Sequence, residues 1–306
     1  MQNDPQPEFR PIPGVPDIVS PGLRRILAPN PSPMTFRGTN TYLLGTSDIA
    51  IIDPGPDDET HLDAILSAVG AAKVSAIFVT HAHLDHSALA RPLSRQTAAP
   101  VYAFSGALGG RSELMQDLAN HGLMRGGEGV DLGFQPDVEL HDGAEIHGAE
   151  WSVQALHTPG HFGNHMCFGW NDTLFCGDLV MGWASSLVSP PDGDLTDFMH
   201  SCRRVQSGIW SVLHSGHGAP ITDPASRLDW LIAHRHSREA ALLSALRDGP
   251  ATCADLARRI YTDTPPTLMR AATRNILAHM IDLYRKKTVI PDGQLTAEAC
   301  FELCHK

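Results

Sequence analysis

The chain has 306 residues, 42% of them hydrophobic, and a formal net charge of −11. This composition is typical of one large folded domain or two unequal ones and excludes a chain that is disordered throughout. The acidic balance argues against a protein that coats nucleic acid or membranes. The charge is uneven, because residues 235–306 carry 11 basic and 8 acidic side chains, or +3, and the rest carries −14. A mildly basic tail is compatible with contact to a polyanion and with an ordinary helical domain.

The N-terminal segment is rich in proline, with six among residues 1–21. This predicts an extended arm and not a folded element. The segment lacks the basic and apolar regions of a signal peptide, and no apolar run approaches the roughly 18 residues of a membrane span. The six cysteines show no paired framework, which predicts reduced thiols. We expect a cytoplasmic protein without a membrane segment.

Short apolar runs that alternate with turn signals predict an α/β domain over residues 22–234. Strands are expected at 41–45, 48–53, 76–80, 101–104, 152–156, 166–170, 173–176 and 211–214, and helices at 61–69, 87–96 and 195–210. Pro92 predicts a break or kink in the second of these helices. Residues 105–140 are rich in glycine and lack a clean period, so we expect an irregular insertion that shapes the substrate site.

The pattern becomes helical from about residue 228. Helices are expected at 228–246, 252–261 and 268–284, followed by a short strand and turn at 286–293. Three helices and a small β-wing predict a winged-helix-like domain at 235–306. The basic residues of this tail form either a phosphate-contacting face or an ordinary solvated helix surface. They are Arg258, Arg259, Arg270, Arg274, Arg285, Lys286 and Lys287.

The strongest chemical signal is the segment Thr80-His81-Ala82-His83-Leu84-Asp85-His86, which follows the buried strand at 76–80. Four metal-capable side chains within six residues are hard to explain as packing. Imidazole is the commonest metal ligand, and a carboxylate adds the charge to hold a second cation. Three further candidates, His161, Asp178 and His217, also follow strands and stand beside glycines that let the backbone bend close to a site.

In this order, the ligands resemble those of the metallo-β-lactamase superfamily. The resemblance covers residues 22–234 and implies a four-layer αβ/βα sandwich with the site at one edge of two facing sheets. It also implies a first metal ion on His81, His83 and His161. A second ion would be held by Asp85, His86 and His217, with Asp178 bridging the two. Asp53, in Ile52-Asp53-Pro54-Gly55, is similar to the acid that orients a ligand in this family.

Two cations about 3.5–4 Å apart can share a hydroxide, which attacks a carbonyl carbon or a phosphorus. Asp85 is expected to steer this nucleophile. The ligand set suits two divalent ions, zinc first, although manganese or iron would also fit. His165 either donates a proton to the leaving group or forms a structural hydrogen bond. It follows Asn164, which cannot supply the negative charge that the family tends to carry there.

Single residues indicate which branch of the superfamily the chain resembles. Asp178 stands where true β-lactamases carry a cysteine ligand, and His83 stands where flavodiiron oxidoreductases carry glutamate. The segment 38–45 and the tail 228–293 resemble the β-lactamase-like protein 2 branch, whose characterised members cleave single-stranded RNA. The glycine pair that the family shows after the Asp-His pair is replaced here by Ser87-Ala88-Leu89.

Three functions follow from these patterns. The first is phosphodiester cleavage of single-stranded RNA, with the tail guiding the substrate. The second is hydrolysis of a lactone or thioester of a small molecule by the same metal chemistry. The third, a binding protein with a vestigial site, is disfavoured because all seven ligands are intact. The chemistry at the metal ions does not separate the first two, and a homodimer stays open.

Overall fold

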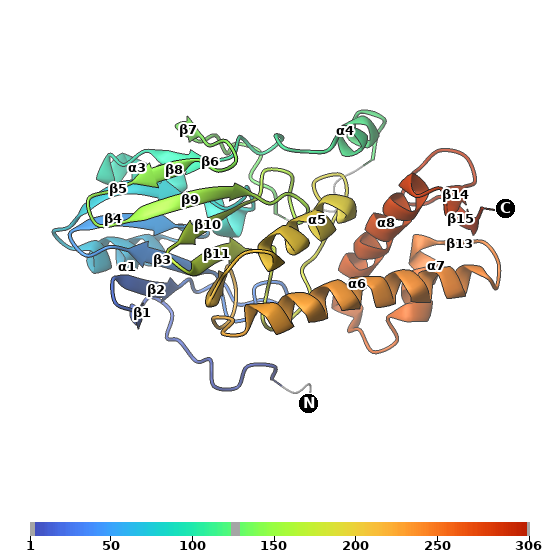
Figure 1. Cartoon of the computed structure of the whole chain (residues 1–306), viewed down its shortest axis with the longest axis horizontal. Coiled ribbons are helices and arrows are strands. Elements are labelled where there is room, and N and C mark those ends of the chain that lie inside the picture. The colour runs from blue at the N-terminus through green and yellow to red at the C-terminus, as the bar shows by residue number, and fades with distance from the viewer. Residues whose placement is uncertain (1–3, 124–128, 305–306) are drawn as a thin grey trace.

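Two facing β-sheets form the centre of the larger domain (Figure 1). The computed structural model describes residues 4–123 and 129–304. Within these residues, the first sheet has seven strands in chain order, β1 (Asp17–Ser20), β2 (Leu23–Leu27), β3 (Asn40–Leu44), β4 (Asp48–Ile52), β5 (Lys73–Phe78), β6 (Val101–Ala103) and β7 (Val138–Glu139). The second sheet runs in the order β12 (Val212–Ser215), β11 (Thr173–Gly177), β10 (Met166–Trp170), β9 (Ser152–His157) and β8 (Glu145–His147).

Helices cover the outer face of each sheet. Because both faces are covered, every residue of β3 and β4 is buried, and β4 is apolar apart from Asp48. The layer between the sheets is aromatic, with the rings of Phe78 and Phe168 5.0 Å apart. Helices α1 (Glu59–Val69) and α3 (Ala90–Thr97) pack on the first sheet. Helices α5 (Leu195–Gln206) and α6 (Pro224–Leu246) pack on the second, which confirms the predicted four-layer αβ/βα sandwich.

The tail forms the predicted winged-helix-like module. Its helices are α7 (Cys253–Ile260) and α8 (Met269–Arg285), with a short 3₁₀ turn at Pro266–Leu268. Its sheet has the order β13 (Ala251–Thr252), β15 (Cys300–Leu303) and β14 (Val289–Pro291) in the described part of the tail. Helix α6 runs without a break through the predicted domain boundary at 234/235. The two modules therefore share one helix.

The segment 105–140 is less irregular than we predicted, because it contains helix α4 (Glu113–Asn120). Ser112 caps this helix by accepting a hydrogen bond from the backbone N–H of Met115. Met115, Leu118 and Leu123 pack into the apolar core of the C-terminal module. Part of the segment therefore holds the modules together. The prediction that it shapes the substrate site is untested, and residues 124–128 lie outside the described residues.

Two other local predictions need correction. The helix expected at 87–96 is broken into α2 (Leu84–Ser87) and α3, but the break precedes Pro92. Pro92 lies in the first turn of α3, where its missing N–H would have had no partner in the helix. The arm 1–21 is expected to contain no folded element, yet its described part, residues 4–21, includes turns, and its residues 17–20 form β1 and pair with β2. No helix among the described residues is long and apolar enough to cross a membrane.

The packing of α4 predicts a stability effect. Met115 is 1% exposed in the C-terminal core, so Met115→Ala should lower the free energy of unfolding by about 2–5 kcal/mol. Leu132→Ala is the control, because Leu132 belongs to the same segment and is 59% exposed; its effect should stay within about 0.5 kcal/mol. Urea unfolding of both variants measures the difference. Equal effects of the two substitutions would contradict the role given to α4.

Candidate metal centre

Seven side chains from both sheets meet at one edge of the sandwich. Each follows a strand that ends there: β5, β9, β11 or β12. Neighbouring parallel strands such as β11 and β12 end at the same edge, so segments that are distant in the chain converge. The structure brings together all seven residues that the sequence predicts as ligands: His81, His83, Asp85, His86, His161, Asp178 and His217.

The seven side chains fall into groups whose ligand atoms lie within 4.8 Å of one another. The first group is His81, His83 and His161, with His83 Nδ1 2.9 Å from His81 Nε2 and 3.2 Å from His161 Nε2. The second is Asp85, His86 and His217, with Asp85 Oδ2 3.3 Å from His217 Nε2. These are the two triads that the family resemblance implies.

Asp178 lies between the two groups. Its Oδ2 atom is 3.4 Å from His217 Nε2 and 3.8 Å from His161 Nε2. Its Oδ1 atom is 3.6 Å from His86 Nε2. One carboxylate therefore faces ligands of both triads, which is the position that a bridging ligand requires.

Acceptors behind the cluster orient the imidazole rings. His161 donates from Nδ1 to the carbonyl of Leu187 at 2.6 Å. His217 donates in the same way to the carbonyl of Gly38 at 3.2 Å. In both rings, Nε2 faces the cluster. This arrangement is common among metal-binding histidines, because the hydrogen bond fixes the ring direction. Burial lowers the pKa of His217, but the carboxylates of Asp178 and Asp85 outweigh it and raise that pKa well above its usual value, so a metal ion would displace the proton from Nε2.

Asp53 orients a ligand of the cluster, as the sequence predicts. Its carboxylate lies 2.9 Å from His86 Nδ1 and accepts hydrogen bonds from the backbone N–H and the hydroxyl of Thr80, at 2.7 and 2.8 Å. The residues that hold Asp53 in place could not be predicted from the sequence. Thr41 donates to the Asp53 carbonyl at 2.7 Å, and His61 Nε2 lies 2.9 Å from the Thr41 hydroxyl. The only sequence signal was a histidine on the apolar face of α1.

The electrostatics of the cluster fit a divalent cation. Burial lowers the pKa of His83 to about 3, and the ring of His161 adds to this effect. Burial also lowers the pKa of His86, but the carboxylates of Asp85 and Asp53 outweigh it and raise that pKa to about 9. His86 Nε2 and Asp178 Oδ1 are buried without a hydrogen-bond partner among the described residues. Metal ions bind such lone pairs and displace the proton from the imidazole.

His165 lies behind the cluster. It is fully buried, and its Nδ1 is 3.0 Å from the hydroxyl of Thr158. Burial and the neighbouring His161 ring keep its pKa well below the usual value, so the ring is neutral near pH 7. This position favours the structural hydrogen bond over the general-acid role, which stays an untested prediction. Asn164 accepts from the backbone N–H of Ala82 at 3.2 Å and so supports the His81 segment.

The surroundings of the cluster are mixed in polarity. A cavity of about 10 Å³ beside His83 and His161, enough for one water molecule, is also lined by Phe162, Leu187, Ser189 and Asp192. Leu84, between two of the ligands, is 46% exposed. On the other side, the rings of Phe36 and Trp183 stack at 5.0 Å next to the His217 loop.

Comparison with known proteins agrees with this geometry. The family model of the metallo-β-lactamase superfamily matches residues 34–217, which include all seven side chains of the cluster, and a β-lactamase-associated winged-helix model matches residues 252–295. The β-lactamase-like protein 2 homolog of Drosophila melanogaster is 30% identical over 90% of this chain and 91% of its own. An atrochrysone carboxyl ACP thioesterase of Aspergillus fumigatus is 30% identical over 91% of this chain and 85% of its own.

A solved structure shows the same fold over almost the whole chain. It is a metallo-β-lactamase family protein of Thermus thermophilus, with a TM-score of 0.75 and 25% identity. The alignment covers 94% of this chain and 100% of that one. The buried histidine and aspartate cluster, the four-layer sandwich and the family match lead to one conclusion: this chain is a hydrolase of the metallo-β-lactamase superfamily that carries the associated winged-helix domain.

Proposed function

We propose that the seven clustered side chains hold two divalent metal ions and that the protein hydrolyses a thioester of a small carboxylic acid. The observation that carries the substrate class is that the cations nearest the cluster are already paired with carboxylates. An acyl group would contact the exposed side chain of Leu84, which lies between two of the ligands. Burying this apolar surface favours an acyl chain over a phosphate backbone.

The arginines nearest the cluster are not available to a polyanion. Arg111 forms an ion pair with Asp192, and both side chains are buried. Arg37 lies 2.6 Å from Asp4. A protein that cleaves RNA needs basic side chains that are free to contact phosphates.

Most basic residues of the tail are also paired or buried. Of the seven considered as a phosphate-contacting face, Lys286 lies 2.6 Å from Asp282, Arg285 3.0 Å from Asp194 and Arg258 2.5 Å from Asp255. Arg274 is only 8% exposed. The other three, Arg259, Arg270 and Lys287, are exposed. Cleavage of single-stranded RNA, the first function expected from the sequence, therefore has less support here than thioester hydrolysis, the alternative.

The names of two relatives also support thioester hydrolysis. The Aspergillus fumigatus protein that aligns over most of both chains is named a thioesterase, and so is a relative from Passalora fulva at 32% identity. A thioester presents a carbonyl carbon to the nucleophile and a sulfur leaving group.

When bound, the metal ions supply a Lewis acid and lower the pKa of a water molecule toward neutrality. The nitrogen and oxygen ligands suit zinc, manganese or iron. Asp85 is placed to orient the attacking water, because its side chain is 27% exposed and lies within the cluster. Water adds to the carbonyl carbon, the carbon–sulfur bond breaks, and the thiol leaves with a proton.

The substrate class can be tested directly. Zinc- or manganese-loaded protein should hydrolyse pantetheine thioesters, with the released thiol measured by its colour reaction, and should leave labelled single-stranded RNA intact. Asp178→Ala removes the carboxylate between the triads and should lower the rate at least about 100-fold. RNA cleavage that disappears in Asp178→Ala, together with intact thioesters, would overturn the proposal in favour of a phosphodiesterase.

The role of Asp53 predicts a loss of metal affinity. Asp53→Asn keeps the shape but weakens the interaction that orients His86, so metal affinity should fall about 10–100-fold. Competition with a coloured chelator measures it. Asp57→Asn is the matched control, because Asp57 is exposed in the same loop and should leave affinity unchanged. Unchanged affinity in Asp53→Asn would show that the hydrogen bond does not support the centre.

The exposed side chain of Leu84 predicts a chain-length effect. Leu84→Asp places a charge where the acyl group would lie, so kcat/KM for a hexanoyl thioester should fall about tenfold, and less for an acetyl thioester. Ile209→Asp is the control, because Ile209 is 92% exposed and lies just after α5. Metal content is measured in both variants. Equal losses for the two substrates at full metal content would remove Leu84 from the acyl site.

A further inference from the structure

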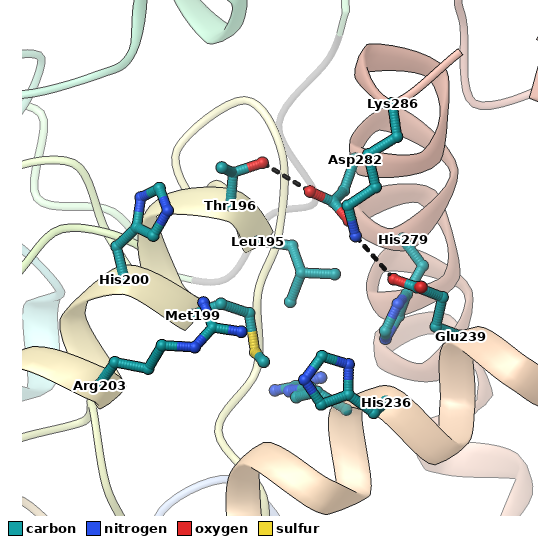
Figure 2. A pocket seen from close by; sticks show the side chains of 11 residues that line it. Leu195, Thr196, Met199, His200, Arg203, His236, Glu239, His279, Asp282 and Lys286 are labelled. Atoms are coloured by element: carbon teal, nitrogen blue, oxygen red, sulfur yellow. Dashed lines mark hydrogen bonds and ion pairs between the residues drawn. The ribbon is translucent and has the colours of Figure 1, made fainter. Parts of the chain in front are cut away.

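A second polar pocket lies between helices α5, α6 and α8 (Figure 2). Its volume is about 120 Å³, which is room for several water molecules or one small ion. It shares no residue with the metal centre. Its lining is rich in basic and imidazole side chains. Of the histidines in the lining, His279 is the most deeply buried. The charged side chains of the lining are Arg203, Arg235, Glu239, Asp282 and Lys286.

His279 is the first sign that the pocket receives a ligand. The side chain is 1% exposed and lines the pocket from α8, where Figure 2 shows it facing the space between the helices. Both ring nitrogens are buried without a hydrogen-bond partner among the described residues. Burial keeps its pKa well below the usual value, and the charges of Arg235 and Lys286 lower it further. A neutral imidazole thus has a buried N–H donor in an electropositive setting, and buried donors normally have partners.

Arg235 is the second sign. It is 2% exposed, and its guanidinium donates to the carbonyl of Ser186 and, at 3.3 Å, to the side-chain oxygen of Asn275. Its guanidinium lies 4.9 Å from the centre of the Phe198 ring. Among the described residues, its Nε atom has no hydrogen-bond partner and its side chain forms no ion pair with a carboxylate. A buried cation is costly unless an anion is close to it.

The acidic residues of the pocket do not supply that anion. Glu239 and Asp282 both bind Lys286, at 2.8 and 2.6 Å, and Asp282 also accepts from the Thr196 hydroxyl at 2.6 Å (Figure 2). Arg203 extends from α5 into the lining, and no ion pair of its side chain is found among the described residues. Counting only the arginines, lysine and carboxylates, the pocket has one more cation than anions.

We propose that this pocket binds a small oxyanion of the phosphate or carboxylate class. The oxygens of such a ligand would accept from the His279 ring and Arg235 Nε at the buried end and from Arg203 at the open end. A metal ion is a poorer match, because the histidines and acids here do not form a group of ligand atoms within 4.8 Å in the described structure. The ligand would join α5 of the sandwich to α6 and α8.

The test is titration of the full-length, metal-loaded protein with inorganic phosphate and, separately, with acetate. Binding is followed by calorimetry and by the rise in the thermal unfolding midpoint. Arg203→Ala should weaken binding of the preferred anion about tenfold, the loss expected for one charged hydrogen bond. Arg204→Ala is the matched control, because it removes the same charge one residue away, from a side chain that pairs with Asp142. It should leave binding unchanged.

Two further variants separate the alternatives. Asp178→Ala disables the metal centre and should not change anion binding. If this variant loses binding and Arg203→Ala has no effect, the anion binds to the metal ions and the proposal is overturned.

His279→Leu should abolish the anion response without lowering the unfolding midpoint of the ligand-free protein, because a buried unpartnered polar group is removed. A lower midpoint with an unchanged anion response would make His279 a structural residue. Absence of binding by both anions would also refute the site.

Discussion

The gathering of five buried imidazoles, one buried carboxylate and one partly exposed carboxylate within one small volume is the constraint on which the rest of this structure depends. Such groups lose their hydration on folding, and the rings of the first triad face one another without an acid between them. Asp53 opposes this cost behind the cluster by holding His86 and Thr80 together. Divalent cations remove the remaining cost by binding the lone pairs that have no other partner.

The sandwich delivers these groups because strands from two sheets end at one edge, and the loops that follow are tightly packed. Glycine is required where the loops touch. A Cβ atom at Gly216 would lie 2.5 Å from His86 Cε1 and 2.6 Å from Asp178 Oδ1. At Gly177, with φ at +45°, a Cβ atom would lie 2.7 Å from His165 Nε2. The glycines beside Asp178 and His217 therefore act by allowing close approach of the backbone to the ligands.

The ligands and the sandwich could be predicted from sequence because their signals are local. The segment from His81 to His86 has its spacing within one short stretch of chain, and the buried strands have continuous apolar runs. Features that depend on distant contacts could not be predicted. Nothing near Met115 indicates that α4 packs into the C-terminal core. No neighbour of Arg285 in the sequence indicates its partner, because the structure pairs it with Asp194, 91 residues away. His279 lies on the apolar stripe of its helix, so the sequence pattern predicts a core position. Only the structure shows that its side chain lines a pocket.

The central claim is that the cluster holds two metal ions, and anomalous X-ray diffraction from crystals of the zinc-loaded protein tests it most directly. We predict two peaks at the zinc absorption edge, one within each triad, and a bridging position for the carboxylate of Asp178. Repeating the experiment with Asp178→Ala should remove at least one peak. Zinc peaks away from the triads would contradict the account. A folded protein that hydrolyses its substrate without bound zinc would contradict it as well.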